Sequence, residues 1–556
     1  MKKKIKKQCK KGLLTLCLSA ALPGTALSAE LLYSLAAEQN ETLREDSTEV
    51  AVQLALSSPE QISPQDEVFF PLPNGQLVTG TVFKTLEGSG PSALEQQATS
   101  VTVISLNNNG GGLRIIEQDG TVTGMILVDN SEKKIYQAAL DSDGFGIIQE
   151  DDRNKYLCVD FPAHKDDPIS VDSAEMLAAT ELTPDLSALQ NLESRPGASK
   201  TLYINYRGGT LSGTAWNVIR NSGNDITYTP YSSDSDTNSF SAADRYNMWL
   251  AWREAAEDYA PFDINVTTSE AVYLTTPVTK RVQIIATTTD FFYPNVGGVA
   301  YTNIFDTNDD YYRTGFVWNS GAGSLGMTIA HESGHQMGLS HDGTSTAGYD
   351  SGHGVWGPIM GSPFNKTYVQ WSKGEYSDAN NQEDDLSIIN GVLGSVNDDA
   401  GDSILSATTL TLPITGHEGL ITPNGIFSDV DVYSFSASGS THIEVKPLLG
   451  DEGENRAANL AMNVTLKNAA GMTVAGITSD DNFTLEPDTN TFVYDGSLTP
   501  GTYYLTIDAV SPDSNWFTGF GKYGNGGMYR MSVSSSVVTV GQGRSFPWLL
   551  FLPALL

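Results

Sequence analysis

The side chains best suited to chemistry lie together in one run, His331-Glu332-Ser333-Gly334-His335-Gln336-Met337-Gly338-Leu339-Ser340-His341-Asp342. His331 and His335 are four residues apart, so on a helix their imidazoles leave the same face. Two nitrogens at that spacing can hold one Zn²⁺. Glu332 points beside such a metal, where its carboxylate can take a proton from a metal-bound water and pass it to a leaving amine. The pattern therefore predicts hydrolytic metal chemistry.

The same run supplies a third metal ligand. Gly338 allows the chain to leave the helix through a positive-φ turn, and the turn brings His341 back toward the first two histidines. Three protein ligands with an open fourth position are typical of a catalytic zinc. Three of the seven histidines of the chain fall within this run. The alternative interpretation is three histidines that cap or fill a helix surface without a metal.

A layer of strands and helices must position these residues. The pattern predicts two long helices, at 241–259 and 324–339, and a shorter one at about 383–393. Strand-like stretches occur at 202–206, 262–267, 281–286, 298–302 and 315–318. This order predicts an α/β layer in which the second long helix carries His331 and His335.

Together with Pro358-Ile359-Met360-Gly361 further along the chain, the histidine run resembles the metzincin metalloproteases. Asp342, directly after the third histidine, is similar to the adamalysin (reprolysin-like) branch. The resemblance covers about residues 198–395. It implies that the three histidines bind zinc, that Glu332 is the general base, and that Met360 forms an apolar floor beneath the metal. Ser362 stands where astacin and serralysin sites carry a tyrosine ligand, so the resemblance implies no tyrosine ligand there.

The metzincin resemblance also implies an edge strand that pairs with an extended substrate by β-augmentation. Gly298, Val299 and Ala300 lie before the active-site helix, where that strand would run. Small residues there would let a peptide backbone approach. The alternative is an ordinary strand with no role in substrate binding.

Residues 1–29 resemble a secretory signal, with lysines at 2–11, an apolar stretch at 12–22 and small residues at 26–29. The apolar stretch is too short to span a bilayer. Its removal takes seven lysines away and moves the formal net charge from −34 to −41. Such acidity argues against a nucleic-acid partner and favours solubility outside the cell.

Cys158 is the one cysteine that remains after Cys9 and Cys17 leave with the signal. A lone thiol in an exported protein needs a reason. Metzincin precursors often block zinc with a propeptide thiolate, and we hypothesise that Cys158 does so here. The alternatives are an incidental buried cysteine and a carboxylate block by Asp160, as in astacin-like precursors.

The alternating strand-like stretches and turn clusters of residues 396–535 predict an antiparallel β-sandwich. The segments Asn397-Asp398-Asp399-Ala400-Gly401-Asp402-Ser403, Asp429-Val430-Asp431 and Pro500-Gly501-Thr502-Tyr503-Tyr504-Leu505 resemble the bacterial pre-peptidase C-terminal domain. That resemblance implies roles in secretion, substrate attachment or Ca²⁺ binding. The acids with candidate oxygen ligands for Ca²⁺ are Asp398, Asp399, Asp402, Asp429 and Asp431. Their alternative interpretation is as solvated turn residues of an acidic chain.

The sequence as a whole predicts a multidomain protein. We expect a signal peptide (1–29), an α+β propeptide (30–197), an α/β (α+β) metzincin catalytic domain with a mixed sheet (198–395), an all-β jelly-roll-like sandwich (396–535) and an apolar tail (536–556). The expected function is that of a secreted, monomeric zinc metalloendopeptidase acting on proteins and peptides, with no stable membrane span and with transient surface retention through the tail as an option. The alternatives are a non-enzymatic surface adhesin with a zinc site and a zinc hydrolase of a non-protein amide.

Overall fold

The computed structural model describes the greater part of the chain. The described residues are 30–31, 33–35, 50–54, 62–74, 76–88, 92–95, 97–107, 111–130, 134–158, 161–164, 185–291, 293–307, 310–364, 366–448, 459–478, 491–510 and 519–536. The expected signal peptide, Asp160 and nearly all of the expected apolar tail lie outside them. The chain forms two compact units, Met1–Val396 with Asn515–Phe520, and Asn397–Ser514 with Gly521–Leu556. The expectation of a multidomain, sheet-rich chain is confirmed.

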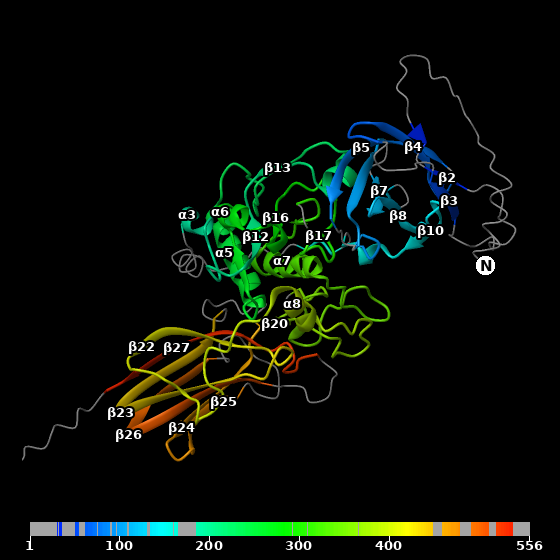
Figure 1. The fold of residues 1–556 in the computed structure, drawn as a ribbon. Coiled ribbons are helices and arrows are strands. Elements are labelled where there is room, and N and C mark those ends of the chain that lie inside the picture. Colours follow the sequence, from blue (N-terminus) through cyan, green and yellow to red (C-terminus); the bar gives the residue numbers. More distant parts are fainter. Residues whose placement is uncertain are drawn as a thin grey trace, which may run out of the picture. The chain divides into compact units, whose positions relative to one another are not determined.

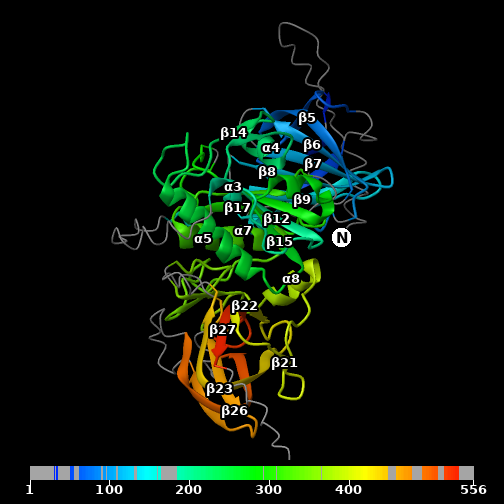
Figure 2. The same ribbon diagram turned by 90° about the vertical axis from the view of Figure 1, so that its left-hand side faces the viewer.

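The first unit begins with a ten-stranded sheet (Figure 1). Its strands are, in spatial order, β1 (Glu30–Leu31), β4 (Glu67–Pro71), β5 (Leu77–Glu87), β6 (Ser100–Leu106), β7 (Gly111–Gln118), β8 (Thr121–Asp129), β9 (Lys134–Ala139), β10 (Phe145–Asp151), β3 (Val50–Leu54) and β2 (Tyr33–Leu35). Strands β5 to β9 lie side by side as an antiparallel series (Figure 2). Alternate residues of the sheet, such as Val68 and Phe70 of β4 and Leu127 of β8, fill a common core.

Short helices and a linking strand follow this sheet. They are η2 (Arg153–Lys155), β11 (Leu157–Cys158) and α3 (Leu186–Leu189). The polar stretch 172–194 has a helical pattern, and only residues 185–194 of it lie within the described residues. There, Asp185 caps α3 by accepting the backbone N–H of Ala188.

A mixed six-stranded sheet forms the centre of the first unit, in the order β11, β17 (Gly298–Tyr301), β18 (Thr314–Val317), β16 (Arg281–Ala286), β12 (Lys200–Asn205) and β15 (Ile264–Thr267). Strands β18, β16, β12 and β15 run parallel, whereas β17 is antiparallel to β18. These parallel strands are largely buried, as expected for strands covered on both faces, and they combine apolar residues such as Ile284 and Val266 with buried polar residues such as Thr201 and Asn265. The mixed sheet predicted from the sequence is thereby confirmed.

Two long helices, α5 (Ala242–Asp258) and α7 (Ala322–Met337), pack against one another, and α7 contacts β16, β17 and β18. A capping box in which Ser241 Oγ accepts the N–H of Asp244 starts α5. The smaller elements are α4 (Ala215–Asn221), α6 (Glu270–Thr275), η3 (Val278–Lys280), α8 (Asp385–Leu393) and the strand pairs β13 (Gly209–Leu211) with β14 (Ile226–Tyr228) and β19 (Trp356–Pro358) with β20 (Tyr368–Gln370). Among the described helices, none has the length and apolar character of a membrane span.

The second unit is a seven-stranded sheet built around two 18-residue strands, β23 (Val430–Pro447) and β26 (Phe492–Ala509). The other strands are β21 (Thr408–Thr409), β22 (Ile414–Ile421), β24 (Met462–Asn468), β25 (Thr473–Thr478) and β27 (Gly527–Ser535). One half of β23 pairs with β27 while β26 pairs with β24, and the alternate apolar residues enclose one core. The jelly-roll-like topology expected from the sequence stays a prediction.

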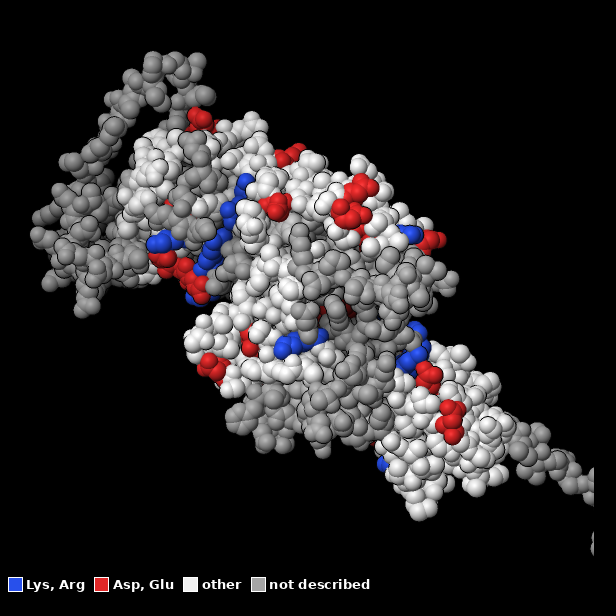
Figure 3. Space-filling view, turned by 180° about the vertical axis from the view of Figure 1, so that it is seen from behind, with Lys and Arg blue, Asp and Glu red and all other residues white. Residues whose placement is uncertain are grey.

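The acidity of the chain is not gathered at one place on the face shown in Figure 3. Acidic and basic side chains of the described residues form small, separate groups on that face. Several ion pairs join such side chains on the surface, such as Lys134 with Glu150 at 2.9 Å and Arg530 with Glu418 at 2.8 Å. The net charge therefore acts as a general repulsion that favours solubility.

Candidate metal centre

Helix α7 carries the first two histidines of the motif, His331 and His335, in its buried C-terminal half. Their Nε2 atoms lie 3.1 Å apart, as the four-residue spacing predicts. Gly334, one residue before His335, leaves room for Met360: a Cβ at Gly334 would lie 2.7 Å from the Met360 sulfur. The fully buried Met360 is thus close to the helix that carries the histidines.

Four ligand atoms converge at this point. Cys158, His331, His335 and His341 each direct one nitrogen or sulfur atom into a group whose members all lie within 4.8 Å of one another. Around a tetrahedral zinc, two nitrogens lie about 3.3 Å apart, and a nitrogen and a sulfur about 3.6 Å apart. The observed separation of His341 Nε2 from Cys158 Sγ is 3.4 Å. The donor set and its spacing therefore fit zinc.

The far nitrogens of the two helical histidines are held by backbone carbonyls. His331 Nδ1 lies 2.8 Å from the Ile359 oxygen, and His335 Nδ1 lies 2.7 Å from the Leu339 oxygen. Each Nδ1–H donates to its carbonyl, so each Nε2 presents a lone pair to the centre of the group. Burial, followed by the neighbouring histidines, lowers the pKa of His331 well below 6.5. The His331 ring is thereby kept in the neutral form that a metal requires.

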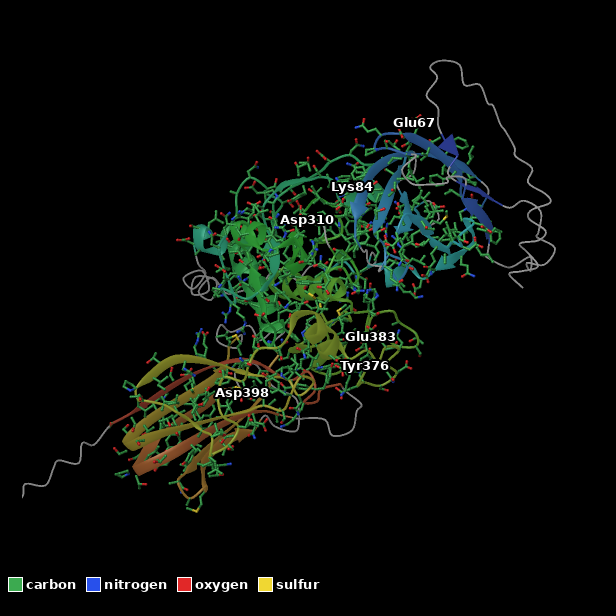
Figure 4. The ribbon with its side chains drawn as sticks, in the orientation of Figure 1. Glu67, Lys84, Asp310, Tyr376, Glu383 and Asp398 are labelled. Atoms are coloured by element: carbon green, nitrogen blue, oxygen red, sulfur yellow. The ribbon has the colours of Figure 1, made fainter. Side chains whose placement is uncertain are left out.

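The third histidine is positioned by the loop after α7. Gly338 ends the helix in the left-handed conformation, with φ of 113°. Glu383 accepts the backbone N–H and the hydroxyl of Ser340 at 2.8 and 2.9 Å, and the Tyr376 hydroxyl donates to the Gly343 carbonyl at 2.8 Å. Figure 4 shows Glu383 and Tyr376 close together near α8. They hold the chain on both sides of His341, whose pKa burial lowers to about 4.

Asp342 connects the histidine loop to the methionine segment. Its backbone N–H donates to the Met360 carbonyl at 2.9 Å, and its own carbonyl accepts the N–H of Asp350 at 2.7 Å. The carboxyl group is buried, and burial together with Glu383 and Asp350 raises its pKa to about 8. Asp342 thus joins the two parts of the chain that surround the metal centre.

Glu332 lies against the edge strand β17. A Cβ at Gly298 would overlap Glu332 Oε1 and come within 2.8 Å of its Cδ and Cγ, so the glycine provides the space for the carboxylate. Cys158 Sγ lies 3.9 Å from Glu332 Oε1. The carboxylate is therefore beside the group of ligand atoms, where the sequence placed it.

The predicted substrate edge strand, Gly298, Val299 and Ala300, is covered by another strand of the chain. Strand β11 pairs with it in antiparallel fashion, with Leu157 opposite Tyr301 and Cys158 opposite Ala300. Residues 159–160 lie outside the described residues. Beyond them, Pro162 forms an isolated antiparallel β-bridge with Val296. The segment from Leu157 to Pro162, which the sequence analysis assigned to a propeptide, thus follows the strand that it assigned to substrate binding.

A family model of "Metallo-peptidase family M12B Reprolysin-like" matches residues 226–342, a stretch that begins at β14 and ends just past the third histidine. The chain carries a reprolysin-like metallopeptidase domain. The model covers the three histidines and Glu332 of the reprolysin-like domain, whereas Cys158 and Met360 lie outside the matched residues. No curated protein matches the chain significantly.

Solved structures similar to parts of the chain include the following three. The pre-peptidase C-terminal domain of a collagenase from Bacillus anthracis is 18% identical, over 25% of this chain and 100% of that one, with a TM-score of 0.16. The periplasmic inhibitor of g-type lysozyme, PliG, of Salmonella Typhimurium is 12% identical, over 24% of this chain and 98% of that one, with a TM-score of 0.15. A mutant of the Escherichia coli inhibitor is 13% identical, over 23% of this chain and 96% of that one, with a TM-score of 0.14.

Sequence reasoning missed three aromatic residues around the metal centre of the reprolysin-like domain. The Tyr349 hydroxyl lies 3.3 Å from His341 Nε2 and 3.8 Å from Cys158 Sγ. Phe161 packs its ring 4.1 Å from that of His331, and Phe364 lies 5.9 Å from Phe161. None of them stands at a motif position, so only the folding of distant segments reveals them. Tyr349 lies eight residues after His341, in a loop without a periodic pattern.

A second group of acids lies in the C-terminal unit. Ligand atoms of Asp398, Asp402 and Asp429, and again of Asp398, Asp399 and Asp431, lie within 4.8 Å of one another. Burial raises the pKa of Asp429 to about 6 and that of Asp431 to about 8. Among the described residues, Asp429 Oδ1 and Asp431 Oδ1 have no hydrogen-bond partner. The five acids proposed from the sequence are thus brought together.

Proposed function

We propose that the protein is a secreted zinc-dependent endopeptidase made as a latent precursor. The observation that carries the proposal is the convergence of three histidine nitrogens on one point beside the Glu332 carboxylate. The reprolysin-like match over residues 226–342 supports the same reaction class. An adhesin would not require a carboxylate buried beside the metal ligands.

His331, His335 and His341 would hold the zinc, and Glu332 would act on the water. The bound metal would polarise the peptide carbonyl and lower the pKa of a bound water. Glu332, fully buried beside β17, would accept a proton from the attacking water and deliver it to the leaving amine. The backbone of Gly298, Val299 and Ala300 pairs with the extended substrate, and Met360 forms the apolar floor beneath the histidines.

Latency in this proposal comes from Cys158. Its sulfur occupies the fourth position of the ligand group, 3.4 Å from His341 Nε2, so no position is left for a water. Strand β11 simultaneously covers β17. Activation requires release of the propeptide by cleavage at Arg195, in the connector before β12, or at Lys200, the first residue of β12.

The finer parts of the proposal concern the two ends of the chain. The signal-like residues 1–29 direct export, the tail at 536–556 allows transient surface retention, and the enzyme acts as a monomer outside the cell. In the C-terminal unit, the buried carboxylates of Asp429 and Asp431, with Asp398, Asp399 and Asp402, bind Ca²⁺. A cation there would compensate the charges that burial otherwise disfavours.

The experiment that tests the function compares the unmutated protein with Glu332→Ala after activation. Zinc content is measured by mass spectrometry, and hydrolysis is measured on casein with and without a chelator. We expect the variant to keep its zinc and to lose hydrolysis by about a hundredfold or more. Casein cleavage at the parental rate by Glu332→Ala would refute the mechanism. Cleavage of acyl-amides without cleavage of casein would favour the non-protein amidase, and zinc binding with no hydrolysis at all would favour the adhesin.

A further inference from the structure

The propeptide segment around Cys158 lies on the edge strand as an extended peptide. Beyond the β11–β17 pairing, the N–H of Thr302 donates to the Tyr156 carbonyl at 3.1 Å. At the other end, the N–H of Gly297 donates to the Phe161 carbonyl at 2.8 Å. The backbone is therefore fixed on both sides of Cys158 through main-chain bonds, which any sequence can make.

The side chains of this segment, in contrast, make contacts that depend on the amino-acid sequence of the bound peptide. Phe161 is completely buried, and its ring lies 4.1 Å from the ring of His331, 5.6 Å from Tyr349 and 5.9 Å from Phe364. These three neighbours lie in the expected catalytic domain, on the far side of the contact from the propeptide segment. We name this group of three the aromatic pocket.

The aromatic pocket lies on one side of the point of catalysis. Cys158 Sγ marks the place beside Glu332 where a substrate carbonyl would lie, and Phe161 follows Cys158 in the chain. A substrate that runs antiparallel to β17, as this segment does, would place residues from the C-terminal side of its cleaved bond at the pocket. Phe161 would then occupy the position of one of those residues.

We propose that the mature enzyme selects substrates that carry a large aromatic side chain shortly after the cleaved bond, and that Phe161 holds that pocket in the precursor. This inference rests on the proposed peptidase function. Full burial of a phenylalanine ring strengthens binding by about tenfold to a hundredfold. An edge-on contact with an aromatic wall adds to that preference.

The first experiment maps cleavage sites with the secreted, propeptide-free enzyme. A peptide library is digested and the new termini are sequenced by mass spectrometry, and matched fluorogenic peptides with Phe or Ala at the enriched position give kcat/KM. We expect Phe, Tyr or Trp to be enriched at one of the first positions after the cut, with kcat/KM at least about tenfold above that for Ala. Phe364→Ala should reduce this ratio. Phe291→Ala, which changes an exposed phenylalanine, should leave the ratio unchanged.

The second experiment measures binding without catalysis. The same enzyme, stripped of zinc by a chelator, is titrated with the peptide of residues 156–164 carrying Cys158→Ser, and with versions that add Phe161→Ala or the exposed-site change Ala163→Ser. We expect about tenfold weaker binding for Phe161→Ala and no change for Ala163→Ser.

The two experiments separate the pocket from the peptidase proposal. Casein cleavage without aromatic enrichment, together with equal binding of the peptides with and without Phe161→Ala, would overturn the pocket and leave the peptidase intact. Absence of all peptide cleavage, with binding that still depends on Phe161, would overturn the peptidase and retain the pocket as a peptide-binding site.

Discussion

A single methyl group at Gly298 should disable the proposed general base. The glycine lies in β17, where a Cβ would overlap Glu332 Oε1 and lie 2.8 Å from Glu332 Cδ. Ordinary contact between carbon atoms is about 3.5–4.0 Å, so the carboxylate carbon must retreat by about 0.7–1.2 Å. The backbone of Gly298 is extended, and alanine adds no strain beyond this overlap.

The expected size of the effect follows from that displacement. A shift of about 1 Å in a catalytic group costs about a hundredfold in rate, which equals about 2.7 kcal/mol of transition-state stabilisation. The three atoms nearest to the new methyl group all belong to Glu332 and none to a histidine, so zinc content should stay at the parental level. The loss should therefore appear in kcat, since the base acts in the chemical step.

The assay measures kcat and KM on a fluorogenic peptide, zinc content by mass spectrometry and the melting temperature of Gly298→Ala. The matched control is Gly391→Ala in α8, where a new Cβ meets no atom within 4 Å. We expect the control to keep full activity and to gain about 0.5–1 kcal/mol of stability. The placement of Glu332 as the base is wrong if Gly298→Ala binds zinc and keeps more than about a third of the parental kcat. It is also wrong if the substitution raises KM and leaves kcat unchanged.

Three further predictions concern latency, folding and calcium. Cys158→Ala should open the fourth ligand position, so that the intact precursor cleaves casein faster than the unmutated precursor although β11 still covers β17; an intact-mass measurement with unchanged latency would contradict this. Buried Glu95 lies 3.3 Å from Arg114, and Arg114→Met would leave this carboxylate without its ion-pair partner. We expect the free energy of unfolding of the precursor to fall by about 3–5 kcal/mol. A fall of less than about 1 kcal/mol in a urea titration would contradict this prediction. Ca²⁺ should raise the melting temperature of the C-terminal unit, and Asp431→Asn should abolish that rise, whereas an equal rise in both proteins would place Ca²⁺ elsewhere.

Local spacing explains why the centre of the site could be predicted. The interval between His331 and His335 matches one turn of a helix, and Gly338 ends that helix at the expected residue. Both features depend only on residues that are close together in the chain, so they can be recognised from the sequence pattern. The order of strands and helices around α7 was likewise readable, because each element carries its own pattern of apolar residues.

The tertiary structure alone decided which distant residues complete the site. Cys158 is 183 residues from His341, yet its sulfur lies 3.4 Å from the imidazole, and Phe161 meets His331 through the pairing of β11 with β17. Sequence reasoning proposed Cys158 because a lone thiol needs a reason, but it had no signal for Phe161. Contacts of this kind arise from sheet pairing and packing between segments far apart in the chain, whereas the motif needed only the geometry of one helix and one turn.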